Sequence, residues 1–310
     1  MGSVLDAIGN TPLIELVSIV RGRRDVKILC KAEFLNPSGS VKDRAAKAMI
    51  LAGIEHGLLK HGMSIIDATS GNTGISYAMI GASLGYRVVL YMPANTSIER
   101  KKLIGYFGAE IVETDPLAGS DGAFLAVREA VRKNPKLWFY PDQYNNPGNS
   151  QAHYEGTGVE ILAQTGGAVT HFVSVAGTSG TFSGTAQRLK EEKPDVYAVL
   201  VQPDSPFHGI EGTKHFDSTI LPGIFYASLA DETMEISTER AYEVTRMLAA
   251  EEGLFVGVSS GANVAAAMRL AQNVPAGSVI VTTLCDSGAR YLSEHFWNPP
   301  ESEGVFDWRI

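Results

Sequence analysis

The feature that most constrains the fold of this chain is the alternation of short apolar runs with longer segments of helical period. Apolar runs of strand length are separated by segments in which apolar residues recur about every 3.6 positions. Such alternation with short connections predicts an α/β fold, with parallel sheets covered by helices on both faces. The expected strands are Val26–Lys31, Ser64–Ala68, Arg87–Met92, Glu110–Glu113, Leu137–Tyr140, His171–Ala176, Tyr197–Gln202 and Ser278–Leu284, and the expected helices are Val41–His56, Ile75–Leu84, Ser97–Phe107, Gly122–Arg132, Thr181–Glu192 and Thr238–Glu252.

A polar, turn-rich segment interrupts this pattern near the middle of the chain. The residues Asp142–Ser150 contain three asparagines, a proline and a glycine, and strand–helix units precede and follow them. This composition is typical of a connection between domains. We therefore expect two α/β domains with a cleft between them, and ligands at the carboxyl ends of the strands.

Composition excludes several classes of protein. Lys and Arg number 26 against 34 Asp and Glu, for a net charge of −8, and no basic run stands out, so no nucleic-acid partner is expected. No apolar stretch reaches the roughly 18 residues of a membrane span, and the first residues lack the pattern of a signal peptide. Cys30 and Cys285 each lie in an apolar stretch, which favours reduced thiols over a disulfide. A soluble cytoplasmic protein without a metal site is expected.

The segment Asn36–Arg44 holds a lysine in an unusual place. Ser40 and Asp43 have the spacing of a capping box, with Asp in place of Glu, which puts Lys42 in the first turn of an Ala-rich helix. A helix N-terminus favours anions, so the ammonium form is disfavoured there. Two interpretations remain open: a solvated surface lysine, or a lysine whose neutral amine forms a Schiff base.

Two glycine-rich loops each follow an expected strand and precede an expected helix. Thr69–Gly74 (Thr-Ser-Gly-Asn-Thr-Gly) combines hydroxyl and amide side chains with backbone N–H groups that can hold a carboxylate and an aromatic hydroxyl. Gly177–Thr181 (Gly-Thr-Ser-Gly-Thr) can close around a phosphate at a helix N-terminus. The second loop lacks the lysine of a nucleotide P-loop and the spacing of a dinucleotide fingerprint. Each loop alone is also compatible with an ordinary glycine turn.

Taken together, these parts are those needed to hold pyridoxal phosphate (PLP) and an amino acid. The motifs NPSGSVKDR, TSGNTG, GTSGT and GVSSG occur in that order, and the chain resembles fold-type II PLP enzymes of the cysteine synthase family. The resemblance extends from Ile8–Leu13 (Ile-Gly-Asn-Thr-Pro-Leu) to Gly288–Ser293. Segments similar to the B-type branch, cysteine synthase B, are His171–Ser174, Leu221–Phe225, Ala227–Leu229 and Gly257–Gly261.

The resemblance implies a fold and a position for the cofactor. The fold is that of the tryptophan synthase β-like enzymes, with two three-layer αβα domains and PLP in the interdomain cleft. Residues 36–148 are expected to form the smaller domain, which carries the Schiff-base lysine and the carboxylate loop. Residues 149–310, with strands from 1–35, are expected to form the larger domain, which carries the phosphate cup.

The resemblance also implies roles for individual residues. Lys42 forms the Schiff base and transfers protons, and Asn72 bonds the ring hydroxyl of PLP. The phosphate is bound by Gly177, Thr178, Ser179, Gly180 and Thr181. The substrate carboxylate is received by Thr69, Ser70, Gly71, Thr73 and Gln143.

Two serines are candidates near the pyridine ring. Ser287 matches the hydroxyl that meets the pyridine nitrogen, and Ser259 matches a further cofactor-binding position of the B-type branch. A hydroxyl partner leaves the pyridine neutral, whereas a carboxylate such as that of the adjacent Asp286 would protonate it and make a stronger electron sink. The weaker sink suits β-elimination.

The activity implied by the resemblance is PLP-dependent cysteine synthesis. O-acetylserine or O-phosphoserine loses its leaving group to give an α-aminoacrylate, and sulfide or thiosulfate adds to give L-cysteine or S-sulfocysteine. Basic residues are typical of B-type relatives at Lys214 and His215, and Lys214 can attract a dianionic substrate, although a solvated loop lysine is equally compatible. The expected partners are these small molecules and a second copy of the chain in a homodimer.

Other functions remain open at this point. A cystathionine β-synthase-like reaction of serine with homocysteine shares the core motifs, and a serine or threonine dehydratase shares a lysine in a similar helix start. A non-catalytic scaffold on the same fold is a distant alternative. A nucleotide-binding protein is disfavoured, because the P-loop lysine and an acidic ribose partner are missing.

Overall fold

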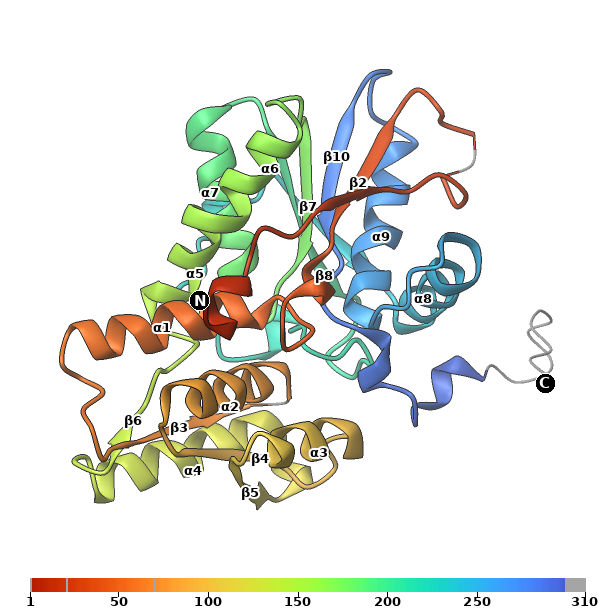
Figure 1. The fold of residues 1–310 in the computed structure, drawn as a ribbon. Coiled ribbons are helices and arrows are strands. Elements are labelled where there is room, and N and C mark those ends of the chain that lie inside the picture. Colours follow the sequence, from red (N-terminus) through yellow and green to blue (C-terminus); the bar gives the residue numbers. More distant parts are fainter. Residues whose placement is uncertain (1, 21, 70, 299–310) are drawn as a thin grey trace.

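The computed structural model describes residues 2–20, 22–69 and 71–298, which form two sheets with helices on their faces (Figure 1). One sheet has six strands, in the spatial order β1 (Leu13–Glu15), β2 (Lys27–Lys31), β10 (Val279–Thr283), β7 (His171–Val175), β8 (Tyr197–Pro203) and β9 (Glu232–Ile236). The other has four, in the order β5 (Glu110–Thr114), β4 (Val88–Pro93), β3 (Ser64–Ala68) and β6 (Trp138–Phe139). All neighbouring strands are parallel except β1 and β2. The predicted α/β class with parallel sheets is confirmed.

The helices follow the order expected for such sheets. Those near the four-stranded sheet are α1 (Lys42–Glu55), α2 (Asn72–Leu84), α3 (Ile98–Tyr106) and α4 (Gly119–Lys133), and those near the six-stranded sheet are α5 (Pro147–Ala152), α6 (Gly158–Gln164), α7 (Gly180–Glu192), α8 (Thr238–Glu252) and α9 (Val258–Ala271). The short helices are η1 (Val4–Ala7), η2 (Glu33–Leu35), η3 (Pro116–Ala118), η5 (Phe216–Ser218), η6 (Ala227–Leu229), η7 (Gly288–Arg290), η8 (His295–Trp297) and the π-helix η4 (His153–Thr157). Figure 1 shows α1 between the two sheets, where it contacts α2 on one side and α5 on the other.

The sequence analysis did not predict β1, β9, α5, α6 and α9, and three of these lack the expected periods in their sequences. Helix α9 is rich in Ala and is buried over most of its length, so it has no polar face to produce an amphipathic pattern. Strand β9 (Glu-Thr-Met-Glu-Ile) lies at an edge of its sheet and carries three polar residues in five. Strand β1 has three residues only.

The segment Asp142–Ser150 is only partly a connection. Its last residues begin α5, in which Asn146 is the N-cap and Pro147 the first residue, and the Asn146 side chain accepts a hydrogen bond from the backbone N–H of Gly148 at 2.9 Å. Helix α5 packs against α1 and α7. The segment expected to connect two domains therefore includes the start of a helix, at 147–150.

Two sequence expectations concern the cysteines and membranes. Cys30 and Cys285 are both free thiols. Within the described ranges, none of the helices combines the length and apolarity needed to cross a bilayer.

Candidate active site

Lys42 is the first residue of α1, as the sequence predicted, but the helix start is built differently from the expected capping box. The N-cap is Val41, without a side-chain cap. The Asp43 carboxylate instead accepts hydrogen bonds from the backbone N–H of Ser38 at 2.7 Å and from the Ser76 hydroxyl at 2.6 Å. The Ser40–Asp43 capping box is thus wrong, because Asp43 is committed to the preceding turn and to α2.

The Lys42 ammonium is held in an environment that disfavours its charge. Removal from water is the main cause that lowers the pKa of Lys42, and the nearby Cys285 and Asp286 oppose it. A lysine of this kind presents a neutral amine more readily than a solvated one, so it suits nucleophilic and proton-transfer chemistry.

The loop Gly177–Thr181 forms a cup between β7 and the N-terminus of α7. A Cβ on Gly177 would collide with the carbonyl oxygen of Gly212, and one on Gly180 would collide with the Asn149 side chain, so both positions require glycine. Ser179 has a φ of 69°, and its buried hydroxyl has no hydrogen-bond partner among the described residues. A buried hydroxyl at a helix N-terminus, with small residues around it, is suited to an anion.

The loop Thr69–Gly74 turns the chain from β3 into α2. The Thr69 hydroxyl oxygen accepts hydrogen bonds from the backbone N–H groups of Gly71 and Gly74, both at 3.1 Å, and Gly71 has a φ of 145°. The Thr73 hydroxyl donates to Gln143 Oε1 at 2.8 Å, and Gln143 Nε2 donates to the carbonyl of Ala68 at 2.9 Å. The predicted carboxylate residues are therefore gathered in one place. Ser70, predicted to belong with them, lies outside the described residues.

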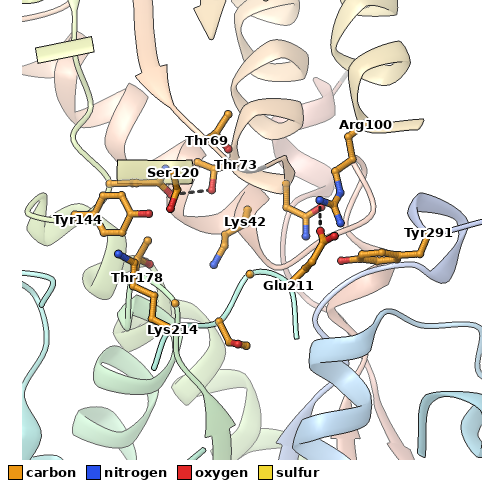
Figure 2. A pocket seen from close by; sticks show the side chains of 15 residues that line it. Lys42, Thr69, Thr73, Arg100, Ser120, Tyr144, Thr178, Glu211, Lys214 and Tyr291 are labelled. Atoms are coloured by element: carbon orange, nitrogen blue, oxygen red, sulfur yellow. Dashed lines mark hydrogen bonds and ion pairs between the residues drawn. The ribbon is translucent and has the colours of Figure 1, made fainter. Parts of the chain in front are cut away.

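Two cavities that share lining residues bring the loops together around Lys42, and Figure 2 shows the larger of them. The larger, of about 170 Å³, is lined by Lys42, Thr69, Asn72, Thr73, Arg100, Ser120, Gln143, Tyr144, Gly177, Thr178, Glu211, Gly212, Thr213, Lys214 and Tyr291. The smaller, of about 40 Å³, is lined by Val41, Lys42, Asn72, Ser174–Thr181, Glu211, Gly212, Ser259 and Cys285. The smaller cavity thus contains the whole cup, and the larger contains the carboxylate loop. Lys42 and Asn72 belong to both.

The two candidate serines near the ring occupy different places. Ser259, 6% exposed, lines the smaller cavity together with the residues of the cup. The Ser287 hydroxyl oxygen accepts a hydrogen bond from the backbone N–H of Ala289 at 3.3 Å, and Ser287 is not among the described residues that line either cavity. The Asp286 carboxylate accepts hydrogen bonds from Asn72 Nδ2 and from the Tyr291 hydroxyl, both at 2.6 Å, and likewise lies outside these linings. The geometry therefore favours Ser259 over Ser287.

Lys214 lies in the wall of the larger cavity with its side chain 11% exposed. Its ammonium is 4.0 Å from Asp121 Oδ1 and 4.7 Å from the centre of the Tyr144 ring. Burial is the main cause that lowers the pKa of Lys214, and Asp121 opposes it. The solvated-lysine interpretation does not fit this position.

Sequence reasoning missed three lining residues that act together. Arg100 forms an ion pair with Glu211, and its guanidinium lies 4.7 Å from the centre of the Tyr291 ring (Figure 2). Arg100 comes from α3 and Glu211 from the segment after β8, so the pair joins parts associated with the two sheets. No local motif could have found it, because residues distant in sequence meet only in the folded chain.

Comparison with known proteins identifies the family of this chain. The family model "Pyridoxal-phosphate dependent enzyme" matches residues 4–286. A cysteine synthase of Aquifex aeolicus is 50% identical over 296 residues, covering 94% of this chain and 90% of that protein, and cysteine synthase B of Escherichia coli is 45% identical, covering 96% and 98%. A solved cysteine synthase of Entamoeba histolytica superposes with a TM-score of 0.92 at 36% identity, covering 97% of this chain and 91% of that one. With a lysine between a phosphate-sized cup and a carboxylate loop, and with these relatives along nearly its whole length, the chain belongs to the cysteine synthase family of pyridoxal-phosphate dependent enzymes.

Proposed function

We propose that this chain is a cysteine synthase that replaces the leaving group of O-acetylserine or O-phosphoserine by sulfide or thiosulfate. The observation that carries the proposal is the position of Lys42, shared by the cavity of the cup and the cavity of the carboxylate loop. A cofactor attached at Lys42 and an amino acid held by the second loop would meet there.

The residues present fit pyridoxal phosphate. The unpartnered hydroxyl of Ser179 and the N-terminus of α7 suit its phosphate, and Gly177 and Gly180 keep the cup open to it. Asn72 lines both cavities together with Lys42, and its amide would donate to the ring hydroxyl. Ser259 lines the smaller cavity and would offer a neutral hydroxyl to the pyridine nitrogen, so we assign it the role expected of Ser287.

Different residues of the chain would carry out different parts of the reaction. Bound pyridoxal phosphate supplies an electron sink for the Cα carbanion. The loop Thr69–Thr73 and Gln143 bind and orient the substrate carboxylate. Lys42, with its lowered pKa, takes the Cα proton and later returns it. Arg100 and Glu211 join across the larger cavity and limit the access of water.

Lys214 supports the use of an anionic substrate. Its ammonium lies in the wall of the larger cavity, beside the aromatic ring of Tyr144 and away from bulk water. A dianion such as thiosulfate or the phosphate of O-phosphoserine gains more from a desolvated cation than from a solvated one.

The remaining expectations belong to the same proposal. We assign residues 36–148 to the smaller domain and residues 149–310, with strands from 1–35, to the larger. This division is supported by the four-stranded sheet, whose strands lie between residues 64 and 139. A cytoplasmic homodimer is supported by the resemblance to the family, and sedimentation of the purified protein measures the oligomeric state.

The experiment that tests the function has two steps. The purified protein is incubated with pyridoxal phosphate and reduced with borohydride, and peptide mapping is expected to find the label on Lys42. O-acetylserine and O-phosphoserine are then each supplied with sulfide, thiosulfate or homocysteine. Cysteine or S-sulfocysteine is the expected product. Label on another lysine contradicts the site, and a preference for homocysteine favours the cystathionine β-synthase-like reaction instead.

A further inference from the structure

A cluster of four charged side chains lies within the fold, outside the two cavities. Lys31 and Glu33 are fully buried, Arg44 has 4% of its side chain exposed and Glu160 14%. The two positive and two negative charges balance. A buried ion-pair cluster is seldom more stable than well-packed apolar residues of the same volume, so its presence calls for a role beyond stability.

Arg44 is the centre of this cluster. Its guanidinium makes two bonds to Glu33, from Nε at 2.7 Å and Nη2 at 2.8 Å, and two to Glu160, from Nη1 at 2.7 Å and Nη2 at 2.8 Å. Nη2 also donates to the Thr11 hydroxyl at 3.1 Å. Lys31 completes the cluster at 2.6 Å from Glu160. Although burial disfavours its charge, Glu160 has a pKa of about 2, because Arg44 and Lys31 stabilise its carboxylate. The Glu160 carboxylate therefore stays ionised at neutral pH, where the Arg44 guanidinium is its partner.

The cluster explains the motif at the start of the chain, which the proposed function leaves without a role. Gly9 has a φ of 94°, and a Cβ there would come within 3.1 Å of Arg44 Nη1. Asn10 follows with a φ of 48°, and its backbone N–H donates to Glu160 Oε1 at 3.0 Å. The Thr11 hydroxyl donates to Glu33 Oε1 at 2.8 Å. The segment thus wraps around the Arg44 guanidinium and both of its carboxylate partners.

Arg44 is connected to the candidate active site in two ways. It lies two residues after Lys42 in the first turn of α1, so fixing Arg44 fixes the start of the helix that carries Lys42. On its other side, Arg44 Nη1 would lie 3.1 Å from a Cβ on Gly156 of the π-helix η4. The same π-helix carries His153, whose Nε2 is 3.2 Å from the Thr181 hydroxyl of the cup. A π-helix often marks a functional site.

We propose that Arg44, clamped by the segment Gly9–Thr11 and by Glu33 and Glu160, is a positioning residue that fixes Lys42 relative to the phosphate cup. This inference rests on the proposed function, because it assumes that Lys42 and the cup hold one cofactor. The clamp is needed because α1 contacts elements on both sides of the cleft, and a small rotation of its first turn would move the lysine. A misplacement of about 1 Å in a reacting group costs about 100-fold in rate.

The test compares two variants of the full-length protein, loaded with pyridoxal phosphate, with one control. Arg44→Lys keeps the charge but cannot make the forked bonds to two carboxylates. Thr11→Val keeps all four charges and removes only the hydroxyl that joins Arg44 to Glu33. The control is Arg87→Lys, in an exposed ion pair with Glu110 whose side chains are 65% and 50% exposed.

Four quantities are measured: the visible circular dichroism per bound cofactor, kcat for O-acetylserine, KM for O-acetylserine, and the thermal unfolding temperature. Arg44→Lys is expected to lower kcat by about 100-fold with KM nearly unchanged, and to reduce the visible circular dichroism. Thr11→Val is expected to lower kcat and the visible circular dichroism by smaller amounts. If Arg44→Lys does not fold, the result for Thr11→Val decides whether the clamp positions Lys42. The control is expected to match the wild type.

One result would overturn the clamp. If folded variants keep the kcat and visible circular dichroism of the wild type and only unfold at lower temperature, the cluster serves stability alone. The failure of the proposed function is recognised separately. A wild-type protein that binds cofactor at Lys42 but forms no cysteine disproves the activity, while the circular dichroism comparison still decides the clamp.

Discussion

At the level of single residues, burial as well as neighbouring charges sets the pKa of the lysines at this site. Lys42 and Lys214 both have a lowered pKa, and in each case removal from water is the main cause. Lys42 lies where the two cavities meet, whereas Lys214 lies in the wall of the larger one against Tyr144. We therefore propose proton transfer for the first and attraction of an anion for the second.

Replacement of Lys214 is predicted to separate anionic from small substrates. Lys214→Met should raise KM for thiosulfate by about tenfold, the effect of one lost charge-assisted contact, and alter the use of sulfide much less. Because the pKa of Lys214 is lowered, the use of thiosulfate should also decline at a lower pH than for an ordinary lysine, as rising pH removes the ammonium charge. Steady-state kinetics across pH measures both effects, with the exposed Lys133→Met as control. An equal effect on the two sulfur donors contradicts the prediction.

The two serines near the ring are predicted to behave differently. Ser259→Ala should shift the absorption of the bound cofactor and slow turnover about fivefold, because one hydrogen bond to the ring is lost. Ser287→Ala should leave the spectrum unchanged, since its hydroxyl bonds the backbone of Ala289. Absorption spectra of the two purified variants decide between them, and the reverse pattern would restore Ser287 to the site.

The acid Asp67, next to the last residue of β3, is predicted to make stability depend on pH. It is 1% exposed, and burial raises its pKa to about 8. Between pH 4 and 8 the folded chain then holds a proton that the unfolded chain releases, so the free energy of unfolding falls as pH rises, by up to ~1.4 kcal/mol per pH unit. Asp67→Asn should flatten this dependence in denaturant titrations. The exposed Asp217→Asn should retain the wild-type slope, and an unchanged slope in Asp67→Asn would contradict the assignment.

At the scale of elements, the site is made where strands end and helices begin. Thr69–Gly74 connects β3 to α2, and Gly177–Thr181 connects β7 to α7, so each loop presents backbone N–H groups and small side chains to the cleft. The carboxyl ends of strands in both parallel sheets supply these loops. Helix α1 adds Lys42 from its own N-terminus between them.

The cup is predicted to tolerate no side chain at its first glycine. Gly177→Ala brings a Cβ against the carbonyl oxygen of Gly212 and should weaken cofactor binding by about 2 kcal/mol, roughly thirtyfold in the dissociation constant. Gly105→Ala is the matched control, because its Cβ enters open space on α3. Fluorescence titration with pyridoxal phosphate measures both. Wild-type affinity in Gly177→Ala would show that the cup adjusts.

At the scale of the whole molecule, contacts across the cleft join the elements around one sheet to those around the other. Arg100 on α3 pairs with Glu211 after β8, and Lys214, three residues later, approaches Asp121 on α4. The backbone N–H of Lys214 donates to the carbonyl of Ala176 at 3.0 Å, which fastens this segment to the base of the cup. Movement of one sheet relative to the other would therefore shift the residues of the cup.

Loss of the Arg100–Glu211 ion pair is predicted to increase local opening in both of the segments that it joins. Glu211→Gln should speed hydrogen exchange several-fold in residues 98–106 and 204–216, corresponding to about 1 kcal/mol for a partly exposed ion pair. Glu243→Gln, in an exposed pair with Arg240, should leave these peptides unchanged. Exchange that increases on one side only would show that the pair does not join the two parts.

The sequence by itself determined the local parts of this protein. Strand and helix periods, glycine-rich turns and the order of the motifs depend on neighbours in the chain, which is why β3 and α8 were predictable. The helical period over 41–56 likewise placed Lys42 in a first turn, although the capping box proposed for that turn was wrong. Helix α9 was not predicted, because burial over most of its length removes the polar face from which a helical period is recognised.

Only the tertiary structure decided which groups share an environment. The choice of Ser259 over Ser287, the burial of Lys214, and the meeting of Arg44 with Glu160 all depend on segments far apart in sequence. Hydrogen bonding and desolvation act over a few ångströms of space, and no spacing along the chain reports which distant residues the fold brings within that range.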